Sequence, residues 1–384
     1  MLAFPVWCLA SVAWSADPAV SLRNAFQLLV TGSVGILIGR TLGLEGTMRA
    51  LGAAMLVCVG ASLLNLVLGV VPAWSQDDFV GAPAYLVGVY DQKNSFGYTV
   101  ALLAWATLQA GLARGRAAGA VACAIALALF PVLRASGSST ALILYALVLS
   151  MPLCRVLLHV TGSVLLSAML GAAAACLVLL ATGLAGTSVP ELVLSITGKD
   201  ATLTGRTEMW DVAFAEFARH PVTGVGYQVF WTSEAFAPQV ALVQATVLEG
   251  VTNFHSAWIE ALVGTGLVGA LALALLPLTV LGIAVARLVR DATPAALGAC
   301  YLAAALLTRS VVEASLYFQH QIDFLLLTAL ATALGSGARR PPRPVEPSVA
   351  PSVAPPGRGA QGHDRARARH RTARTTTAEA ARAH

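Results

Sequence analysis

Arg206 and His255 are the residues whose types and settings best suit chemistry. Apolar residues recur at three- and four-residue spacing over 206–219, which predicts one stripe of an amphipathic helix. Thr204 and Gly205 are expected to start this helix, so Arg206 would stand in its first turn, where unpaired backbone N–H groups favour an anion. We expect Arg206 to bind a phosphate or diphosphate. Pairing with a nearby acidic residue is the alternative.

His255 lies immediately before an apolar run and is therefore expected at a membrane interface. An imidazole can accept a proton from a hydroxyl group, and a positioned acid or base typically contributes roughly 10² to 10⁴ in rate. His255 is thus a candidate general base. A structural hydrogen-bonding role is the alternative.

Arg309 and Glu313 lie four residues apart within one apolar run, which predicts an ion pair on one helix face toward the bundle interior. Such a pair serves either to neutralise two buried charges or to line a polar cavity beneath an active site. Asp323, near the start of the next apolar run, is given no role.

These residues belong to a chain that is mostly apolar. Hydrophobic residues make up 57% and charged residues 11%, the mean hydropathy is +0.75, and soluble domains carry about 25% charge. The six cysteines are scattered without a CxxC or Cys/His cluster, which indicates neither a metal site nor a disulfide framework. We expect an integral membrane protein.

Apolar runs close to the roughly 20 residues that cross a bilayer predict about ten transmembrane helices in an all-α, polytopic fold. The runs lie at about 1–14, 25–39, 48–71, 95–113, 117–133, 139–153, 156–184, 256–286, 294–316 and 322–336. A cleaved signal peptide is the alternative for the first run.

The distribution of arginine predicts the orientation, because cytoplasmic connections are enriched in Lys and Arg. With both termini in the cytoplasm, the connections on that side contain Arg40, Arg49, Arg114, Arg116, Arg155, Arg287 and Arg290. The long loop 185–255, with its amphipathic helix, is then extracytoplasmic. The membrane domain would span 1–337, and 338–384 would be a disordered basic tail facing lipid headgroups, so the net charge of +5 requires no nucleic acid.

Several separated motifs resemble those of a known family. The strongest are G-R-x-x-x-W at 205–210, P-x-x-G-x-G at 221–226, and H-S-x-x-x-E at 255–260 followed by three glycines. W-S-A-D-P at 14–18 and D-Q-K-N-S-F-G at 91–97 add to them. In order and separation they are similar to the O-antigen ligase and polysaccharide polymerase superfamily (Wzy-type, ExoQ-like) of bacterial membrane glycan transferases.

The resemblance implies a GT-C-like helical fold that transfers a glycan from an undecaprenyl-diphosphate-linked donor to an acceptor hydroxyl, on the outer face of the cytoplasmic membrane and without a metal or other cofactor. It implies that Arg206 binds the donor diphosphate and His255 activates the acceptor. Lys93, Asn94 and Arg134 are further expected substrate-binding residues; Arg134 would replace a family basic residue where this chain has Ser139. The acceptor is left open between glycan, lipid and protein.

Two other classes remain at this stage. A transporter of lipid-linked sugar or small solute would also be polytopic, but the sequence shows no internal repeat or paired interrupted helices. An inactive scaffold of an envelope assembly complex is the third reading. The N-terminus is expected to be one or two helices shorter than in the family.

Overall fold

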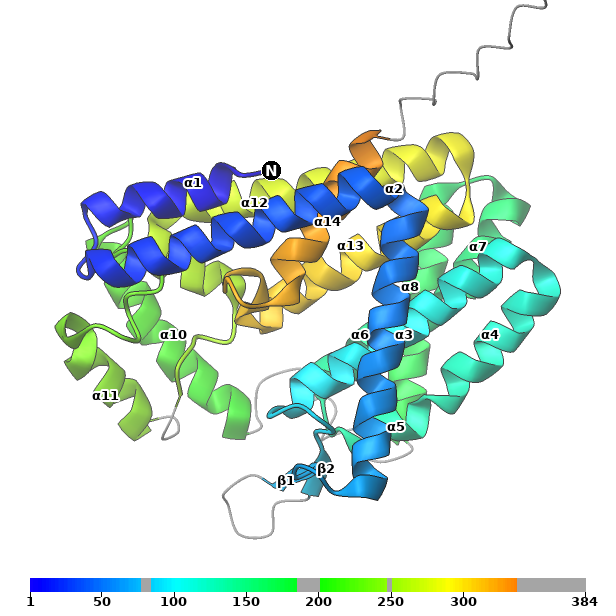
Figure 1. Cartoon of the computed structure of the whole chain (residues 1–384), viewed down its shortest axis with the longest axis horizontal. Helices are drawn as coiled ribbons and strands as arrows, with labels where there is room; N and C mark the ends of the chain where they lie inside the picture. The colour runs from blue at the N-terminus through cyan, green and yellow to red at the C-terminus, as the bar shows by residue number, and fades with distance from the viewer. Residues whose placement is uncertain (77–83, 185–200, 247–250, 337–384) are drawn as a thin grey trace, which may run out of the picture. The chain divides into compact units, whose positions relative to one another are not determined.

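The computed structural model describes residues 1–76, 84–184, 201–246 and 251–336, and of residues 180–184, 201–207, 246 and 336 it describes only the backbone. Most of these residues are helical (Figure 1). The tail 338–384 and the start of the long loop, 185–200, lie outside the described residues. The helices are α1 (Ala3–Ala10), α2 (Pro18–Leu68), α3 (Lys93–Arg114), α4 (Arg116–Ala128), α5 (Phe130–Ala135), α6 (Ser139–Leu149), α7 (Met151–Thr161), α8 (Val164–Leu184), α10 (Ala201–Arg219), α11 (Ala237–Thr246), α12 (Ala257–Asp291), α13 (Pro294–Val312) and α14 (Ile322–Ser336).

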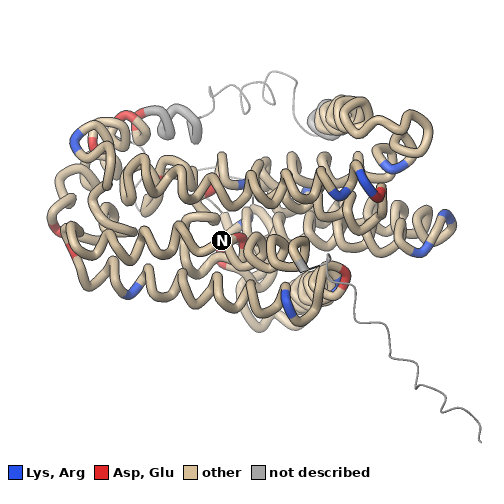
Figure 2. Tube along the Cα trace, turned by 90° about the horizontal axis from the view of Figure 1, so that it is seen from above, with Lys and Arg blue, Asp and Glu red and all other residues tan. Residues whose placement is uncertain are grey.

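Six helical stretches in the described part of the chain are long and apolar enough to cross a membrane, and three shorter apolar helices accompany them. Long parts of these helices carry neither Lys or Arg nor Asp or Glu (Figure 2). Large apolar side chains are exposed along them, for example Phe26 at 59% and Leu275 at 60%. Such surfaces suit lipid rather than water. The chain is an all-α, multi-pass membrane protein.

The predicted spans 25–39 and 48–71 form one helix, α2, and the loop expected between them is absent. Gly43, with φ 63° and ψ −173°, is the single non-helical residue inside α2, and the helix changes direction along its length (Figure 1). A straight helix of 51 residues would be about 76 Å long at 1.5 Å per residue, more than twice the hydrocarbon core. The kink leaves two halves of roughly 25 residues, each long enough to cross.

The predicted break at Arg155 is also wrong. Arg155 lies inside α7. The chain turns after this helix ends at Thr161, at Gly162 (φ 63°) and the residue before α8. The Arg155 side chain donates a hydrogen bond to the carbonyl of Ala292, just beyond α12. Its charge therefore caps a neighbouring helix end, where backbone carbonyls favour a cation.

The packing of α2 against α14 depends on two glycines. A Cβ at Gly35 would lie 2.0 Å from Thr328 Oγ1, and one at Gly39 would lie 2.2 Å from the carbonyl oxygen of Ala329. Small residues at this spacing let two membrane helices approach closely. The contact joins the first half of α2 to the last helix of the described chain.

The connections contain structure that the periodicity did not indicate. Strands β1 (Trp74–Gln76) and β2 (Ala84–Leu86) pair antiparallel before α3, with Ser75 opposite Tyr85. In the long loop, α10 begins at Ala201, so Arg206 is not in the first turn as predicted, because Ala201 and the residues after it continue the helix through Gly205. Met209 and Ala213 on the predicted stripe are buried in a core shared with α12, whereas Phe214 is 48% exposed.

Candidate active site

The segment before α12 holds His255 in an unusual backbone conformation. His255 has φ 51°, in the left-handed region that few residues other than glycine adopt. Its backbone N–H donates to Asn253 Oδ1 at 2.9 Å, and its side chain is half-buried. Strained backbone of this kind persists where the surroundings hold it and often marks a functional site.

Two motif residues hold the peptide that precedes His255. The backbone N–H of Phe254 donates to Glu260 Oε1 at 2.6 Å, and its carbonyl accepts from Trp210 Nε1 at 2.9 Å. The indole of Trp231 also donates to Glu260 Oε1, at 3.2 Å. We call this arrangement the Phe254 clamp. It joins α10, the loop and the first turn of α12, and explains why the buried Glu260 side chain, 3% exposed, is tolerated there.

The glycine motifs dock the loop onto an interrupted helix. Inside α12, Gly266 has φ 67° and ψ −171°, and Leu267 N donates to the carbonyl of Pro221 at 2.8 Å instead of to its own helix. The carbonyl of Gly264 accepts from Gly226 N at 2.9 Å. A Cβ at Gly266 would lie 2.3 Å from the Val222 carbonyl oxygen. The glycines thus allow backbone-to-backbone contact of the loop and the helix.

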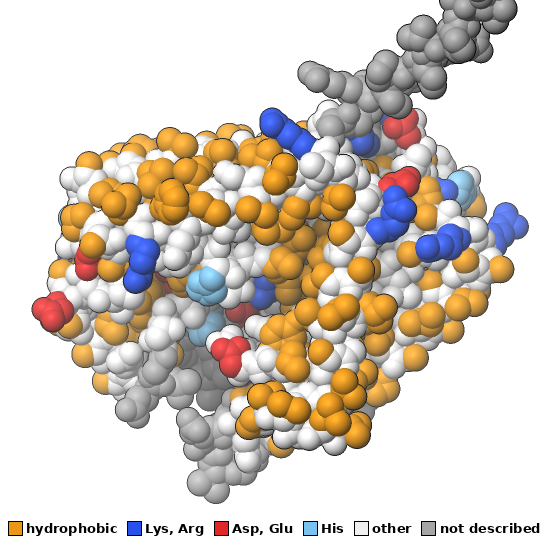
Figure 3. Space-filling view, viewed as in Figure 1, with side chains coloured by type: hydrophobic (Ala, Val, Ile, Leu, Met, Phe, Trp, Pro, Cys, Tyr) orange, Lys and Arg blue, Asp and Glu red, His pale blue; other side chains and the backbone are white. Residues whose placement is uncertain are grey.

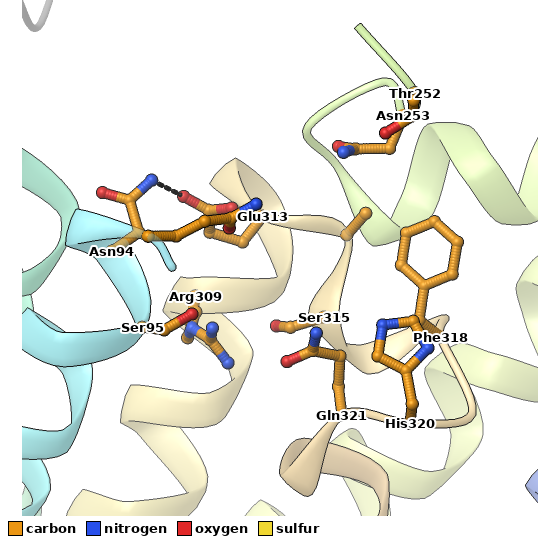
Figure 4. A pocket seen from close by; sticks show the side chains of 12 residues that line it. Asn94, Ser95, Thr252, Asn253, Arg309, Glu313, Ser315, Phe318, His320 and Gln321 are labelled. Carbon is orange, nitrogen blue, oxygen red and sulfur yellow. Dashed lines mark hydrogen bonds between the residues drawn. The ribbon is translucent and has the colours of Figure 1, made fainter. Parts of the chain in front are cut away.

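A polar cavity of about 220 Å³ lies beside the His255 segment (Figure 4). Its lining comes from three parts of the chain, which are the beginning of α3 and the residue before it, the loop before His255, and the end of α13 with the turn that follows. The residues are Gln92, Asn94, Ser95, Thr252, Asn253, Arg309, Glu313, Ala314, Ser315, Phe318, His320 and Gln321. The backbone N–H of Ala257 donates to the carbonyl of Glu313 at 3.1 Å and so ties the His255 segment to this wall. Histidine and charged side chains gather near the middle of the face in Figure 3, whereas hydrophobic side chains cover much of the rest.

The predicted ion pair between Arg309 and Glu313 is wrong. Arg309 Nη1 instead donates to both carboxylate oxygens of Asp323, each at 2.7 Å, and the guanidinium lies over the Tyr98 ring at 3.9 Å. The reason is that α13 ends at Val312 and Glu313 is extended (φ −139°, ψ 144°), so the four-residue helical spacing no longer applies. Asp323 is fully buried and is the counter-ion that the sequence left without a role.

Glu313 faces the start of α3 instead. Its Oε1 accepts from Asn94 Nδ2 at 2.7 Å, and Asn94 Oδ1 accepts from the hydroxyl of Ser138 at 2.7 Å. Ser138 is also the N-cap of α6, where its side chain accepts from Ala141 N. A chain of hydrogen bonds therefore joins α6, α3 and the end of α13 at the cavity wall.

The other wall is fixed by two tyrosines. Tyr227 Oη donates to the carbonyl of Tyr317 at 2.6 Å, and Tyr317 Oη accepts from Gln228 N at 3.1 Å, with Gln228 at φ 58°. Burial raises the pKa of both phenols well above their ordinary range, so they stay uncharged donors. They hold the turn that presents Phe318 and His320 to the cavity.

Of the predicted site residues whose side chains the structure describes, Asn94 alone is among the residues that line this cavity. Asn94 lines the cavity, and its neighbour Lys93 lies with its ammonium 4.4 Å from the centroid of the Tyr85 ring. Arg134 is exposed on α5 and is not part of the cavity lining. The backbone of Arg206 belongs to α10, but its side chain lies outside the described residues. Asn253 brings the His255 segment to the same cavity as Asn94.

Sequence reasoning missed Asp323, Glu313 as the partner of Asn94, and the Phe254 clamp. The sequence did contain a signal for Asp323. An arginine in a membrane helix, such as Arg309, is costly unless an acidic side chain lies close to it in space. Glu260 and Trp210 stood in the motifs but gave no sign of their shared partner. Among the described residues, no group of three or more His, Cys, Asp or Glu side chains could hold a metal ion.

The fold and these motifs define a multi-pass membrane protein with a polar site at the ends of its helices. Residues 99–274 match the family described as O-Antigen ligase, a range that contains Trp210, His255, Glu260 and the docking glycines. The chain is also 28% identical over 359 residues to the exopolysaccharide production protein ExoQ of Rhizobium meliloti (strain 1021), covering 88% of this chain and 78% of the relative. By both comparisons the chain is similar to proteins of the O-antigen ligase/Wzy-type superfamily.

Proposed function

We propose that this protein transfers a glycan from an undecaprenyl-diphosphate-linked donor to an acceptor hydroxyl on the outer face of the cytoplasmic membrane. The reaction is that of a metal-independent ligase or polymerase, with His255 as the general base and Arg206 as a ligand of the donor diphosphate. The similarity to the O-antigen ligase family and to the exopolysaccharide production protein supports glycan ligation or polymerisation. The acceptor is a glycan, a lipid or a protein.

The observation that carries the proposal is the convergence of two separate motifs, those of Trp210 and Glu260, on the peptide before His255. Trp210 and Glu260 hold Phe254, and the strained His255 follows next to a polar cavity. Strain costs about 1 to 3 kcal/mol and needs a compensating function or packing. A base fixed in this way is pre-organised for proton transfer.

The chemistry explains why a base, rather than an acid, is needed. A carrier diphosphate is a good leaving group whose departure needs stabilisation of negative charge, which Arg206 would supply. A sugar hydroxyl is a poor nucleophile until its proton has an acceptor. His255 therefore takes the proton from the acceptor as the new glycosidic bond forms at the donor sugar and the bond to the diphosphate breaks.

Substitution of His255 tests the proposal. His255→Gln keeps hydrogen-bonding capacity but is not basic, so we expect transfer to fall by about 10² or more with donor binding nearly unchanged. Wild-type transfer should fall as the medium is acidified and the imidazole is protonated. His220→Gln, an exposed histidine of the same loop, is the control. A His255→Gln protein with the wild-type rate and pH profile would show that His255 is structural.

The transporter alternative gains one observation from the structure. Both α2 and α12 are interrupted at a glycine, Gly43 and Gly266, as helices around transporter sites often are. At Gly266, however, the freed backbone groups bind the loop 221–226 rather than line a cavity. Uptake of labelled lipid-linked sugar into vesicles, without glycan transfer, would favour transport.

A further inference from the structure

The interruption of α12 at Gly266 frees backbone groups that need partners outside the helix, because backbone polar groups in a membrane protein must be satisfied by nearby protein groups. The loop segment 221–226 bonds four of these groups, through two carbonyls that accept and two N–H groups that donate, at 2.8 to 3.4 Å. The carbonyl of Thr265, directly before the interruption, accepts from Trp7 Nε1 at 2.9 Å. A residue of α1, 258 positions away in the chain, thus takes part in the same junction.

The N-terminal segment, residues 4–16, also bonds the loop itself. Trp14 Nε1 donates to the carbonyl of Thr223 at 3.1 Å, and Ser11 Oγ accepts from the backbone N–H of Tyr227 at 3.2 Å. In Figure 1, α1 lies alongside α12 and the first part of α2, and it contacts both helices. The loop is therefore held by the N-terminal segment as well as by α12.

One face of the N-terminal segment is packed into the core. Phe4 is 1% exposed, and Cys8 and Ser11 are fully buried. The Phe4 ring lies 6.1 Å from the ring of Tyr227 and 6.0 Å from that of Tyr317, measured between centroids. Close packing transmits a displacement of one side chain to its neighbours. The N-terminal segment is therefore coupled to both tyrosines that fix the cavity wall.

The loop leads from Tyr227 to the Phe254 clamp. Trp231 follows Tyr227 closely in the chain, and its indole donates to Glu260 Oε1 at 3.2 Å. The same oxygen accepts from the backbone N–H of Phe254, the residue before His255. A shift of the loop at Tyr227 would therefore move Trp231 and disturb the clamp.

We propose that the N-terminal segment positions His255 for proton transfer, and that Trp7 is the positioning residue through which it fixes the interruption of α12. This role rests on the proposed function, because it takes His255 as the base. Of the residues that line the described cavity, none belongs to the N-terminal segment, so we assign the segment no contact with substrate. Its hydrogen bonds should therefore support kcat rather than the binding of donor or acceptor.

Hydrogen–deuterium exchange of the full chain in lipid nanodiscs tests the positioning role without turnover. Trp7→Phe removes the indole N–H and keeps an aromatic ring beside Trp14, whose ring centroid lies 5.3 Å from that of Trp7. We expect amide exchange in 221–231 and 253–260 to become about tenfold faster, because a hydrogen bond to a buried carbonyl is lost. Trp105→Phe, which removes an indole bond to another buried carbonyl, is the control and should leave both segments unchanged. Unchanged exchange in Trp7→Phe would overturn the positioning role.

Ser11→Ala is the second variant, for use if Trp7→Phe does not accumulate in the membrane. The change removes the acceptor of the Tyr227 N–H at a buried position, with little change in volume. Amide exchange in the loop should rise, and kcat should fall in the wild type but not in a His255→Gln background. Ser33→Ala, at a hydroxyl that bonds a carbonyl of its own helix, is the control and should change neither. Faster exchange in Ser11→Ala with an unchanged kcat would overturn the positioning role.

Transfer kinetics test the link to His255. Trp7→Phe should lower kcat by about tenfold and leave the KM values for donor and acceptor unchanged. In a His255→Gln background the same change should have almost no further effect, whereas a general loss of structure would lower the rate equally in both backgrounds. Additive losses, or a raised KM with an unchanged kcat, would overturn the inference. Wild-type transfer by His255→Gln would instead overturn the proposed base while the exchange result stood, so the two failures are distinguishable.

Discussion

At the scale of single residues, the Phe254 clamp is the feature that links the family motifs to a physical role. Trp210 and Glu260 touch the backbone next to His255, not the reacting atoms, and are positioning residues. Their hydrogen bonds hold a half-buried histidine in a conformation that costs energy. A change in either should therefore act through His255.

We expect Trp210→Phe to lower transfer by about tenfold to hundredfold, because it removes the donor to the Phe254 carbonyl and lets the base move. In a His255→Gln background the same change should have almost no further effect, since the group it positions is gone. Trp105→Phe is the control, because the Trp105 indole also donates to a buried backbone carbonyl, that of Gly298 at 3.0 Å. Equal losses in both tryptophan variants, or additive losses with His255→Gln, would count against the clamp.

Arg206 gives the second prediction at this scale. Arg206→Lys keeps the charge but loses the two-pronged geometry that suits phosphate oxygens, so transfer should fall strongly at normal membrane abundance. Arg219→Lys, at the exposed end of the same helix, should have little effect. Affinity for the lipid-linked donor measures the difference. Wild-type turnover in Arg206→Ala would exclude Arg206 from the site.

At the scale of elements, the interruption of α12 decides how the loop is held. Three glycines allow the effect of backbone strain to be compared with that of steric contact. Gly266 has a positive φ, and a Cβ there would meet a backbone carbonyl; Gly43 has a positive φ, but a Cβ there would have no atom within 4 Å. At Gly282 φ is not positive and a Cβ would have no atom within 4 Å. A residue other than glycine at φ near +65° and ψ near −170° costs about 1 to 3 kcal/mol. The docked loop adds a steric cost at Gly266 alone.

We expect thermal stability to follow that order. Gly282→Ala should leave the melting temperature unchanged or slightly raised, Gly43→Ala should lower it, and Gly266→Ala should lower it most and also reduce transfer. The measurement is thermal unfolding of each variant in the same nanodiscs. If Gly266→Ala and Gly43→Ala behaved alike, the contact between the loop and α12 would contribute no stability.

At the scale of the whole molecule, orientation decides where the site works. The arginine distribution predicts a cytoplasmic tail and an extracytoplasmic long loop. In a variant without the six native cysteines, a membrane-impermeant thiol reagent added to intact cells should label a cysteine at Thr232 but not one at Ser348. Thr232 is exposed in the described loop, and Ser348 belongs to the tail beyond the described residues. The opposite labelling would place the site in the cytoplasm.

The sequence by itself determined the class of the protein and much of its helical content. Hydrophobic residues make up 57% of the chain and form runs of about 20 residues, which indicates segments that cross a membrane. These segments are predicted to be helices, because backbone polar groups in lipid must form their hydrogen bonds within each segment. The helix 206–219 was also visible, since its apolar spacing is local to the chain. The helix boundaries were not all predicted correctly, because the two spans predicted on either side of Gly43 form one kinked helix.

Only the tertiary structure decided which side chains meet. Arg309 pairs with Asp323, fourteen positions further along the chain, because α13 ends before Glu313, and Asn94 meets Glu313 across 219 positions. The Phe254 clamp and the docking at Gly266 likewise join residues about 44 positions apart. Helical periodicity fixes neighbours within one element, whereas contacts between elements depend on how the helices pack and where each one ends.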